Sequence, residues 1–205
     1  MAGRNEPCPC GSGRKHKVCC SRRNGHPLPE RAGWLQRKAS AFLLRPTQPF
    51  GLREIAVAYA GPDADDASWI DAALHDPLTQ DLALFDTDVF ASFLDVRGEL
   101  PADEFELGRS WVGLARSLYE VTDVRPGEGM RLRDLRTGER LDVTERLATQ
   151  DLVPGTLLYA RVGPDGRAHQ LLGCTLTIEP TLCDQLTAFL DTKPGPEEVT
   201  AWFGA

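Results

Sequence analysis

The segment from Gly3 to Cys20, GRNEPCPCGSGRKHKVCC, decides how the chain begins to fold. Its cysteines follow the spacing C-x-C-x8-C-C, at Cys8, Cys10, Cys19 and Cys20. A segment this short and this rich in Gly and Pro cannot build a hydrophobic core, so disulfides or a metal ion must hold it together. Four thiolates around one ion form a closed tetrahedral site of the structural kind.

The rest of the sequence favours the metal over disulfides. The opening residues MAGRNEP lack the apolar core of a secretory signal, and no run of 18 apolar residues predicts a transmembrane helix. We therefore expect a cytoplasmic protein in a reducing compartment, where disulfides are rare. Zn²⁺ is the default ion for a four-thiolate structural site, and iron is the alternative.

Charge is distributed as unevenly as the cysteines. Residues 1–45 carry ten Lys/Arg and two Asp/Glu, a balance of +8, and residues 46–205 carry thirteen and twenty-eight, a balance of −15, which together give the net charge of −7. A basic N-terminal segment on an acidic body suggests contact with a negatively charged partner, such as RNA, anionic lipid or an acidic protein surface. The alternative is that the basic residues only solvate a small metal knuckle.

Residues 3–20 resemble the SEC-C motif, a metal-binding segment found at the C-terminus of the preprotein translocase ATPase SecA and in smaller bacterial proteins. The motif pattern Gly-Arg-Asn-Asp-Pro-Cys-Pro-Cys-Gly-Ser-Gly departs here at Glu6, and His16 replaces an aromatic residue. The resemblance implies that the four cysteines are the ligands. It further implies a protein partner, either an export chaperone or the ribosome, and contact with acidic phospholipid, and it covers under a tenth of the chain.

The body is predicted to be α+β. Apolar spacing predicts helices over 33–44, 50–60, 67–74, from Pro77, over 88–97 and from Pro101, and further helices after Pro180 and Pro196. Between them, short β-branched runs separated by Gly turns predict a small β-barrel of the SH3 or OB size. The predicted organisation is a SEC-C-like motif (1–22), a linker (23–32), a helical region (33–115), a barrel (116–179) and C-terminal helices (180–205).

No catalytic constellation is recognisable in this sequence, so we expect a protein that is not an enzyme. The leading hypothesis is a metal-binding interaction or adaptor protein linked to protein export or chaperone contacts. The alternative is an RNA- or ribosome-associated protein that uses the basic knuckle and barrel arginines on one predicted hairpin, Arg131, Arg133, Arg136 and Arg140. The two remaining cysteines, Cys174 and Cys183, lie among apolar residues and are expected to be inert core thiols.

Overall fold

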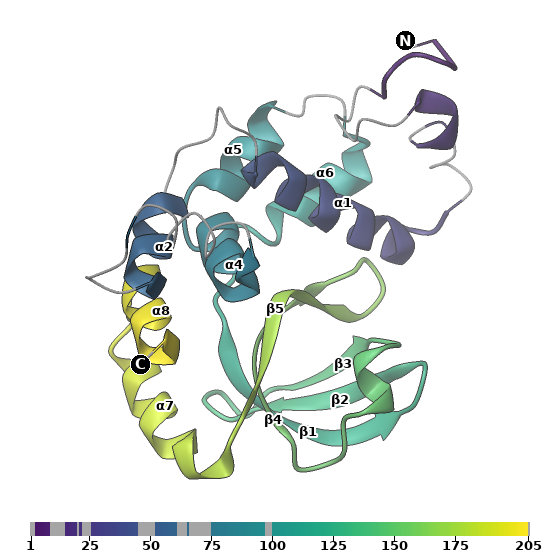
Figure 1. The fold of residues 1–205 in the computed structure, drawn as a ribbon. Coiled ribbons are helices and arrows are strands. Elements are labelled where there is room, and N and C mark those ends of the chain that lie inside the picture. Colours follow the sequence, from purple (N-terminus) through teal and green to yellow (C-terminus); the bar gives the residue numbers. More distant parts are fainter. Residues whose placement is uncertain are drawn as a thin grey trace.

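The computed structural model describes residues 3–8, 15–19, 21, 26–44, 52–60, 65, 75–96 and 100–204. Figure 1 shows the order of the elements in these residues. The α-helices are α1 (Leu28–Leu43), α2 (Leu52–Ala60), α4 (Pro77–Phe85), α5 (Val89–Val96), α6 (Ala102–Arg109), α7 (Cys183–Asp191) and α8 (Pro196–Gly204). The strands are β1 (Ser117–Arg125), β2 (Gly129–Asp134), β3 (Arg140–Thr144), β4 (Leu157–Pro164) and β5 (His169–Ile178), and the short 3₁₀ helices are η1 (His16–Val18), η3 (Ala148–Gln150) and η4 (Pro180–Leu182).

The predicted fold class is confirmed, because a helical region precedes a small closed barrel and C-terminal helices follow it. The strand bounds agree closely with the apolar runs between Gly turns. The helix predicted over 67–74 lies outside the described residues. The helix that begins near Pro101 ends at Arg109, earlier than the apolar pattern suggests.

Helix α1 begins at Leu28, inside the segment assigned to the linker from its prolines and glycine. Pro29 lies in the first helical turn, and Pro27 is the N-cap residue. Proline is tolerated at these positions because the first N–H groups of a helix have no intrahelical partner. The prolines here mark a helix start, and the prediction of a helix from residue 33 was five residues late.

Helix α4 begins as the sequence predicts. Asp76 is its N-cap, and the Asp76 carboxylate accepts a hydrogen bond from the Thr79 backbone N–H at 2.5 Å. Pro77 occupies the first turn. Such a cap typically stabilises a helix by about 1 kcal/mol.

The five strands close into a barrel in the order β1-β2-β3-β5-β4. Neighbouring strands are antiparallel except β3 and β5, which meet in parallel at Val143 and His169. Gly129 permits the close approach of β2 to β3, since a Cβ there would lie 2.3 Å from the Val143 carbonyl oxygen. The predicted SH3/OB-sized barrel is therefore present as a closed five-stranded sheet.

Strand β4 is buried on both faces. Leu158, Ala160 and Val162 point into the barrel interior, where they pack with Val121 and Met130. The alternate residue Tyr159 belongs instead to the larger core that the helices form, together with strand residues Leu118, Leu172 and Ile178. The outer face of the barrel thus belongs to the core of the helical region, and the barrel interior forms a second core.

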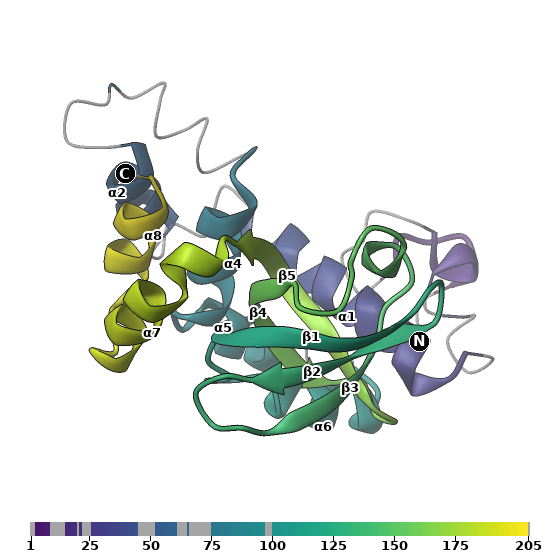
Figure 2. The same cartoon turned by 90° about the horizontal axis from the view of Figure 1, so that it is seen from below.

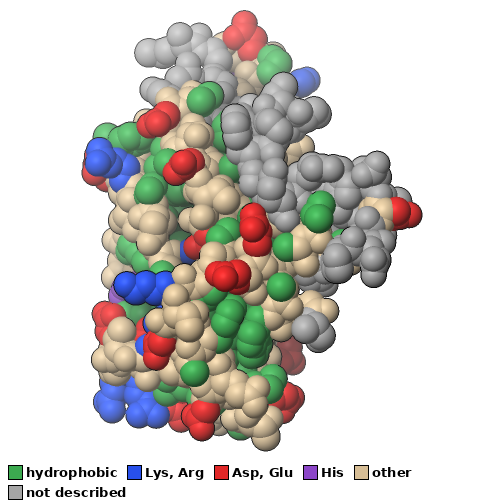
Figure 3. Space-filling view, turned by 90° about the vertical axis from the view of Figure 1, so that its left-hand side faces the viewer, with side chains coloured by type: hydrophobic (Ala, Val, Ile, Leu, Met, Phe, Trp, Pro, Cys, Tyr) green, Lys and Arg blue, Asp and Glu red, His purple; other side chains and the backbone are tan. Residues whose placement is uncertain are grey.

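The remaining helices complete the body. Figures 1 and 2 show α2, α7 and α8 along one flank of the molecule, with α1, α5 and α6 over one end of the barrel. Seen from that flank, acidic and hydrophobic side chains are spread over the face and most of the Lys and Arg side chains lie along one edge (Figure 3). Among the described helices, none has the length and apolar character needed to span a membrane.

Candidate functional site

In the N-terminal segment, the residues that precede Cys8 lie beside residues 15–17, which lead to Cys19. Pro7 and Lys15 form an isolated antiparallel bridge. The His16 N–H donates to the Glu6 carbonyl oxygen at 2.9 Å, and the Lys17 N–H donates to the Arg4 carbonyl oxygen at 2.9 Å. These bonds hold the chain leading into Cys8 beside the chain that leads to Cys19.

A tight turn at Gly3 shapes the start of this segment. The Glu6 N–H donates to the Gly3 carbonyl oxygen at 3.0 Å. In return, the Gly3 N–H donates to the Glu6 side chain, at Oε2, at 2.6 Å. Glu6, which stands where the SEC-C pattern has Asp, therefore closes this turn with its side chain.

The second cysteine pair follows the single 3₁₀ turn η1. The Val18 N–H donates to the Lys15 carbonyl oxygen at 3.0 Å, and the Cys19 N–H donates to the His16 carbonyl oxygen at 3.1 Å. His16 is half-buried within this turn. Cys19 thus leaves the turn at a fixed position relative to the bridge between Pro7 and Lys15.

The described cysteines differ from their neighbours in burial. Cys8 is 4% exposed, although residues 3–7 are all exposed. Cys19 is half-buried. Cys10 and Cys20 lie outside the described residues, and within the described ranges no group of three or more His, Cys, Asp and Glu side chains is arranged to hold a metal. The structure brings the chain segments of Cys8 and Cys19 together, and the complete four-cysteine set remains a prediction.

The barrel arginines do not form an open cationic surface. Arg131 Nε lies 3.6 Å from Asp142 Oδ1. Arg133 Nη2 lies 2.5 Å from Glu120 Oε2, and Arg136 Nη2 lies 2.9 Å from Asp191 Oδ1. Three of the four arginines considered for RNA contact are paired with carboxylates, so the barrel gives the RNA hypothesis no support.

A buried charged cluster that the sequence did not predict lies between α4 and the barrel. Asp81 Oδ1 lies 2.7 Å from Arg116 Nη1 and 3.1 Å from Arg161 Nη2. Burial alone would lower the pKa of Arg161, but the charges of Asp81 and Asp86 outweigh burial and raise it. Arg161 is fully buried and lies within the apolar strand β4. An arginine inside an apolar run was the sequence signal that could have indicated a buried charged cluster.

Close packing and aromatic contacts surround the charged cluster. Asp81 Oδ2 accepts from the Cys174 N–H at 2.9 Å, and a Cβ on Gly173 would lie 1.4 Å from that oxygen. The Arg116 guanidinium carbon lies 4.5 Å from the centre of the Tyr159 ring.

Burial raises the pKa of the Cys174 thiol, which favours the neutral form. Cys174 and Cys183 are both half-buried.

The N-terminal segment carries a known motif. The SEC-C motif matches residues 4–22, which contain all four predicted ligands. The chain is also similar to protein translocase subunits: 73% identical over 22 residues to SecA of Geobacter sulfurreducens, 74% over 23 residues to SecA 1 of Rhodopirellula baltica, and 80% over 20 residues to SecA of Pelotomaculum thermopropionicum.

These matches are confined to the motif. They cover 10–11% of this chain, and the chain spans only 2% of the length of each relative. No solved structure matches the chain. Residues 4–22 are therefore assigned to the SEC-C motif, and residues 23–205 are not assigned to a family.

Proposed function

We propose that this protein is a metal-binding, non-catalytic interaction protein whose SEC-C segment holds a structural Zn²⁺ ion through Cys8, Cys10, Cys19 and Cys20. Iron is the other ion that such a donor set accepts. The observation that carries the proposal is the SEC-C match over residues 4–22. Bound metal would fold the segment, because its described hydrogen bonds join mainly backbone groups and Cys8 is the one buried side chain among its described residues.

The burial of Cys8 supports the fit of a metal. Cys8 is buried although the other described residues of the segment are exposed or half-buried, and enclosure of the thiol is what a closed tetrahedral site requires. The backbone bonds around Glu6 and His16 position the chain on both sides of such an ion. The metal is therefore proposed as the internal support of the segment rather than as a catalytic centre.

The surface of the segment supports a contact role. Val18 is 47% exposed, and Lys15 beside it is exposed as well. Residues 1–25 carry six Lys/Arg and one Asp/Glu, and four thiolates with a divalent ion add −2, which leaves about +3. An apolar side chain among cations suits an acidic protein surface with an apolar patch.

The motif shared with SecA supports a partner in protein export, and an export chaperone is the partner that we propose for this segment in the cytoplasm. The body would then supply the second contact of an adaptor.

Elemental analysis of the full chain, purified without added metal, tests the metal proposal. We expect about one zinc or iron per chain, and loss of that metal in Cys10→Ser. Cys183→Ser is the matched control and should keep the metal. Absence of metal from the wild type, or equal metal in the wild type and Cys10→Ser, would contradict the site.

Crosslinking followed by partner identification tests the adaptor role. We compare the wild type with Cys8→Ser and with Val18→Ser, the latter leaving the ligands intact. Both substitutions should reduce capture of the same partner. A set of partners that is identical in all three proteins would refute recruitment by this segment while leaving the metal site standing.

A further inference from the structure

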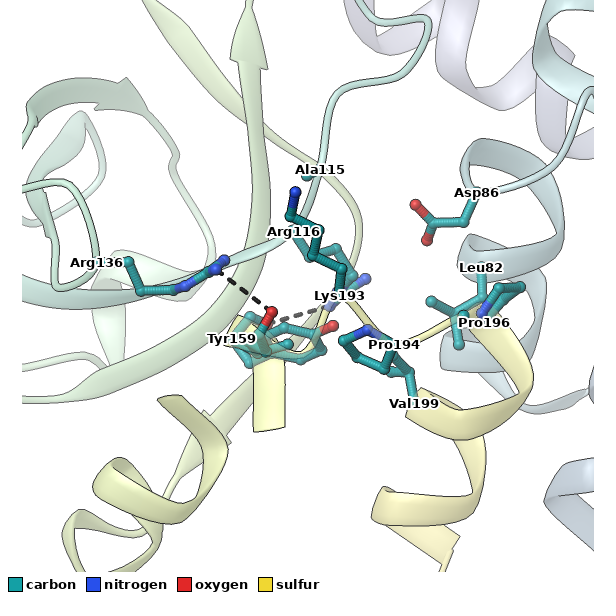
Figure 4. A pocket seen from close by; sticks show the side chains of 12 residues that line it. Leu82, Asp86, Ala115, Arg116, Arg136, Tyr159, Lys193, Pro194, Pro196 and Val199 are labelled. Atoms are coloured by element: carbon teal, nitrogen blue, oxygen red, sulfur yellow. Dashed lines mark hydrogen bonds between the residues drawn. The ribbon is translucent and has the colours of Figure 1, made fainter. Parts of the chain in front are cut away.

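A cavity of about 550 Å³ lies in the body, where α4, the segment before β1, the β2–β3 turn, β4 and the α7–α8 loop meet (Figure 4). Its volume is within the range of small-molecule sites in proteins. Its walls come from five parts of the chain that are distant in sequence. The packing of the body, rather than any local motif, creates the cavity.

Among the charged side chains that line the cavity, cations outnumber carboxylates. Figure 4 shows Arg116 and Arg136 on the barrel side and Lys193 on the α7–α8 loop, with Asp86 just after the end of α4. Asp86 is already bound to Arg161, at 2.7 Å between Asp86 Oδ2 and Arg161 Nη2. The lining itself therefore carries three cations and one engaged carboxylate.

Counting the ion-pair partners leaves an excess of one positive charge. The cations Arg116, Arg136, Arg161 and Lys193 face the carboxylates Asp81, Asp86 and Asp191. Lys193 accounts for the excess, since it makes no ion pair with any residue in the described ranges. Lys193 is exposed and lines the cavity from the loop between α7 and α8.

Arg116 has hydrogen-bonding capacity left over. Its side chain is 2% exposed. Its Nη2 donates to the Tyr159 and Cys174 carbonyl oxygens at 3.1 Å and 2.7 Å. Its buried Nε finds no hydrogen-bond partner in the described part of the chain. A buried donor without a partner destabilises the fold, and an anionic group nearby would offset part of that cost.

The start of α8 does not offer the cavity a free N–H at Gly195. The Gly195 N–H, at the mouth of that helix, donates to Glu198 Oε2 at 2.7 Å and is thus already capped by a carboxylate. Apolar side chains complete the lining, with Leu82, Leu190 and Val199 each buried. The cavity therefore combines a cationic rim with an apolar wall.

We propose that this cavity binds a small organic anion, with a phosphate or carboxylate group between Lys193 and Arg136 and its hydrocarbon portion against Leu82, Leu190 and Val199. The site is separate from the SEC-C segment and does not depend on the proposed metal. Arg116 contributes a fixed positive charge behind the anionic group. Phosphate and carboxylate share the chemistry that Lys and Arg recognise.

Binding to the full-length protein is measured with three probes that share an aromatic ring: phenyl phosphate, benzoate and benzyl alcohol. We expect saturable binding of at least one anionic probe, with shifts in the amide NMR signals of Lys193 and Gly195, and much weaker binding of the neutral alcohol. Preference for phenyl phosphate or for benzoate identifies the anionic group. Failure of both anions to bind, or equal binding of benzyl alcohol, would overturn the proposal.

Lys193→Gly is the most informative variant. Lys193 has φ of 56°, a left-handed conformation that glycine adopts without strain, so the substitution removes the charge without weakening the fold. We expect about tenfold weaker binding of the anion in Lys193→Gly, and a similar loss in Arg136→Ala, by analogy with the strength of charged hydrogen bonds.

Arg167→Ala is the matched control. Arg167 is an exposed cation in the β4–β5 turn and does not line the cavity. Its removal should leave the affinity unchanged. Unchanged affinity in Lys193→Gly, or an equal loss in Arg167→Ala, would show that the anion does not bind in this cavity.

Discussion

Asp81 of α4 and Arg161 of β4 are 80 residues apart in sequence, yet Arg161 Nη2 donates to Asp81 Oδ1 at 3.1 Å and both side chains are fully buried. The same carboxylate also pairs with Arg116. Asp81 thus pairs with two buried guanidinium groups at the junction of helices and barrel, and Asp86 supplies a second carboxylate to Arg161.

Asp81→Asn should destabilise the body strongly. The substitution leaves two buried cations with too little compensating charge, and breaking a buried ion pair from one side costs about 3–5 kcal/mol. The measurement is the free energy of unfolding from urea titration. Asp191→Asn, which removes an exposed partner of Arg136, is the control and should change stability by no more than about 1 kcal/mol. Equal effects in the two variants would contradict this role of Asp81.

Gly173→Ala should also be strongly destabilising, for a steric reason. Gly173 has φ of +63°, and a Cβ there would lie 1.4 Å from Asp81 Oδ2, so the carboxylate would have to move away from the Cys174 N–H. Gly138 offers a control, because its φ is +78° and nothing lies within 4 Å of its Cβ position. Gly138→Ala should cost only the backbone strain of about 1–2 kcal/mol. We expect a clearly larger loss for Gly173→Ala in the same urea titration.

Alkaline pH should destabilise the protein through two tyrosines. Burial raises the pKa of Tyr119 and of Tyr159 from 10.0 to about 12. The unfolded chain therefore loses these phenolic protons first, and stability that is fully present below pH 10 is lost as the pH rises toward 12. Each unit of pKa difference between the folded and the unfolded protein corresponds to about 1.4 kcal/mol of stability for each tyrosine.

Ultraviolet titration of phenolate and unfolding curves at several alkaline pH values test this expectation. Tyr119→Phe should flatten the loss of stability, because one of the two linked protons is gone. Ionisation of all the tyrosines near pH 10 in the folded protein would contradict the shifts.

At acidic pH the protein should lose the stabilisation that the ion pair between Arg31 of α1 and Asp103 of α6 contributes. A hydrogen bond from Arg31 lowers the pKa of Asp103, and the Arg31 charge adds to the effect. The stability that this pair contributes is present above the ordinary Asp pKa and is lost as the pH falls through the lowered value. It is small, because the Asp103 side chain is 47% exposed. Carboxyl NMR titration should show a higher pKa for Asp103 in Arg31→Gln, and no change in Arg37→Gln.

Local signals in the sequence predicted much of the fold. Asp76 and Pro77 indicated the start of α4 because a cap and a first-turn proline act within one helical turn. Gly turns indicated the strands, since residues such as Gly138 and Gly166 have positive φ. The predicted start of α1 was wrong because of Pro27 and Pro29. Local sequence does not distinguish a proline in a linker from a proline in the first turn of a helix.

Long-range features could not be predicted in this way. Asp81, Arg116 and Arg161 belong to one cluster only because α4 packs against the outer face of the barrel. The cavity beside Lys193 likewise depends on how α7 and α8 return to the body. At the N-terminus, the cysteine spacing predicted the motif, and the folding back of the chain at Pro7 and Lys15 agrees with it.

The burial of β4 on both faces determines how the body unfolds. The same backbone supports the barrel interior at Leu158 and the helical core at Tyr159, so neither layer can be opened without exposing the other. Heat should therefore melt the helices and the barrel in one cooperative calorimetric transition. The helical region and the barrel thus form one folding unit, whereas the similarity to the SecA proteins is confined to the short SEC-C segment.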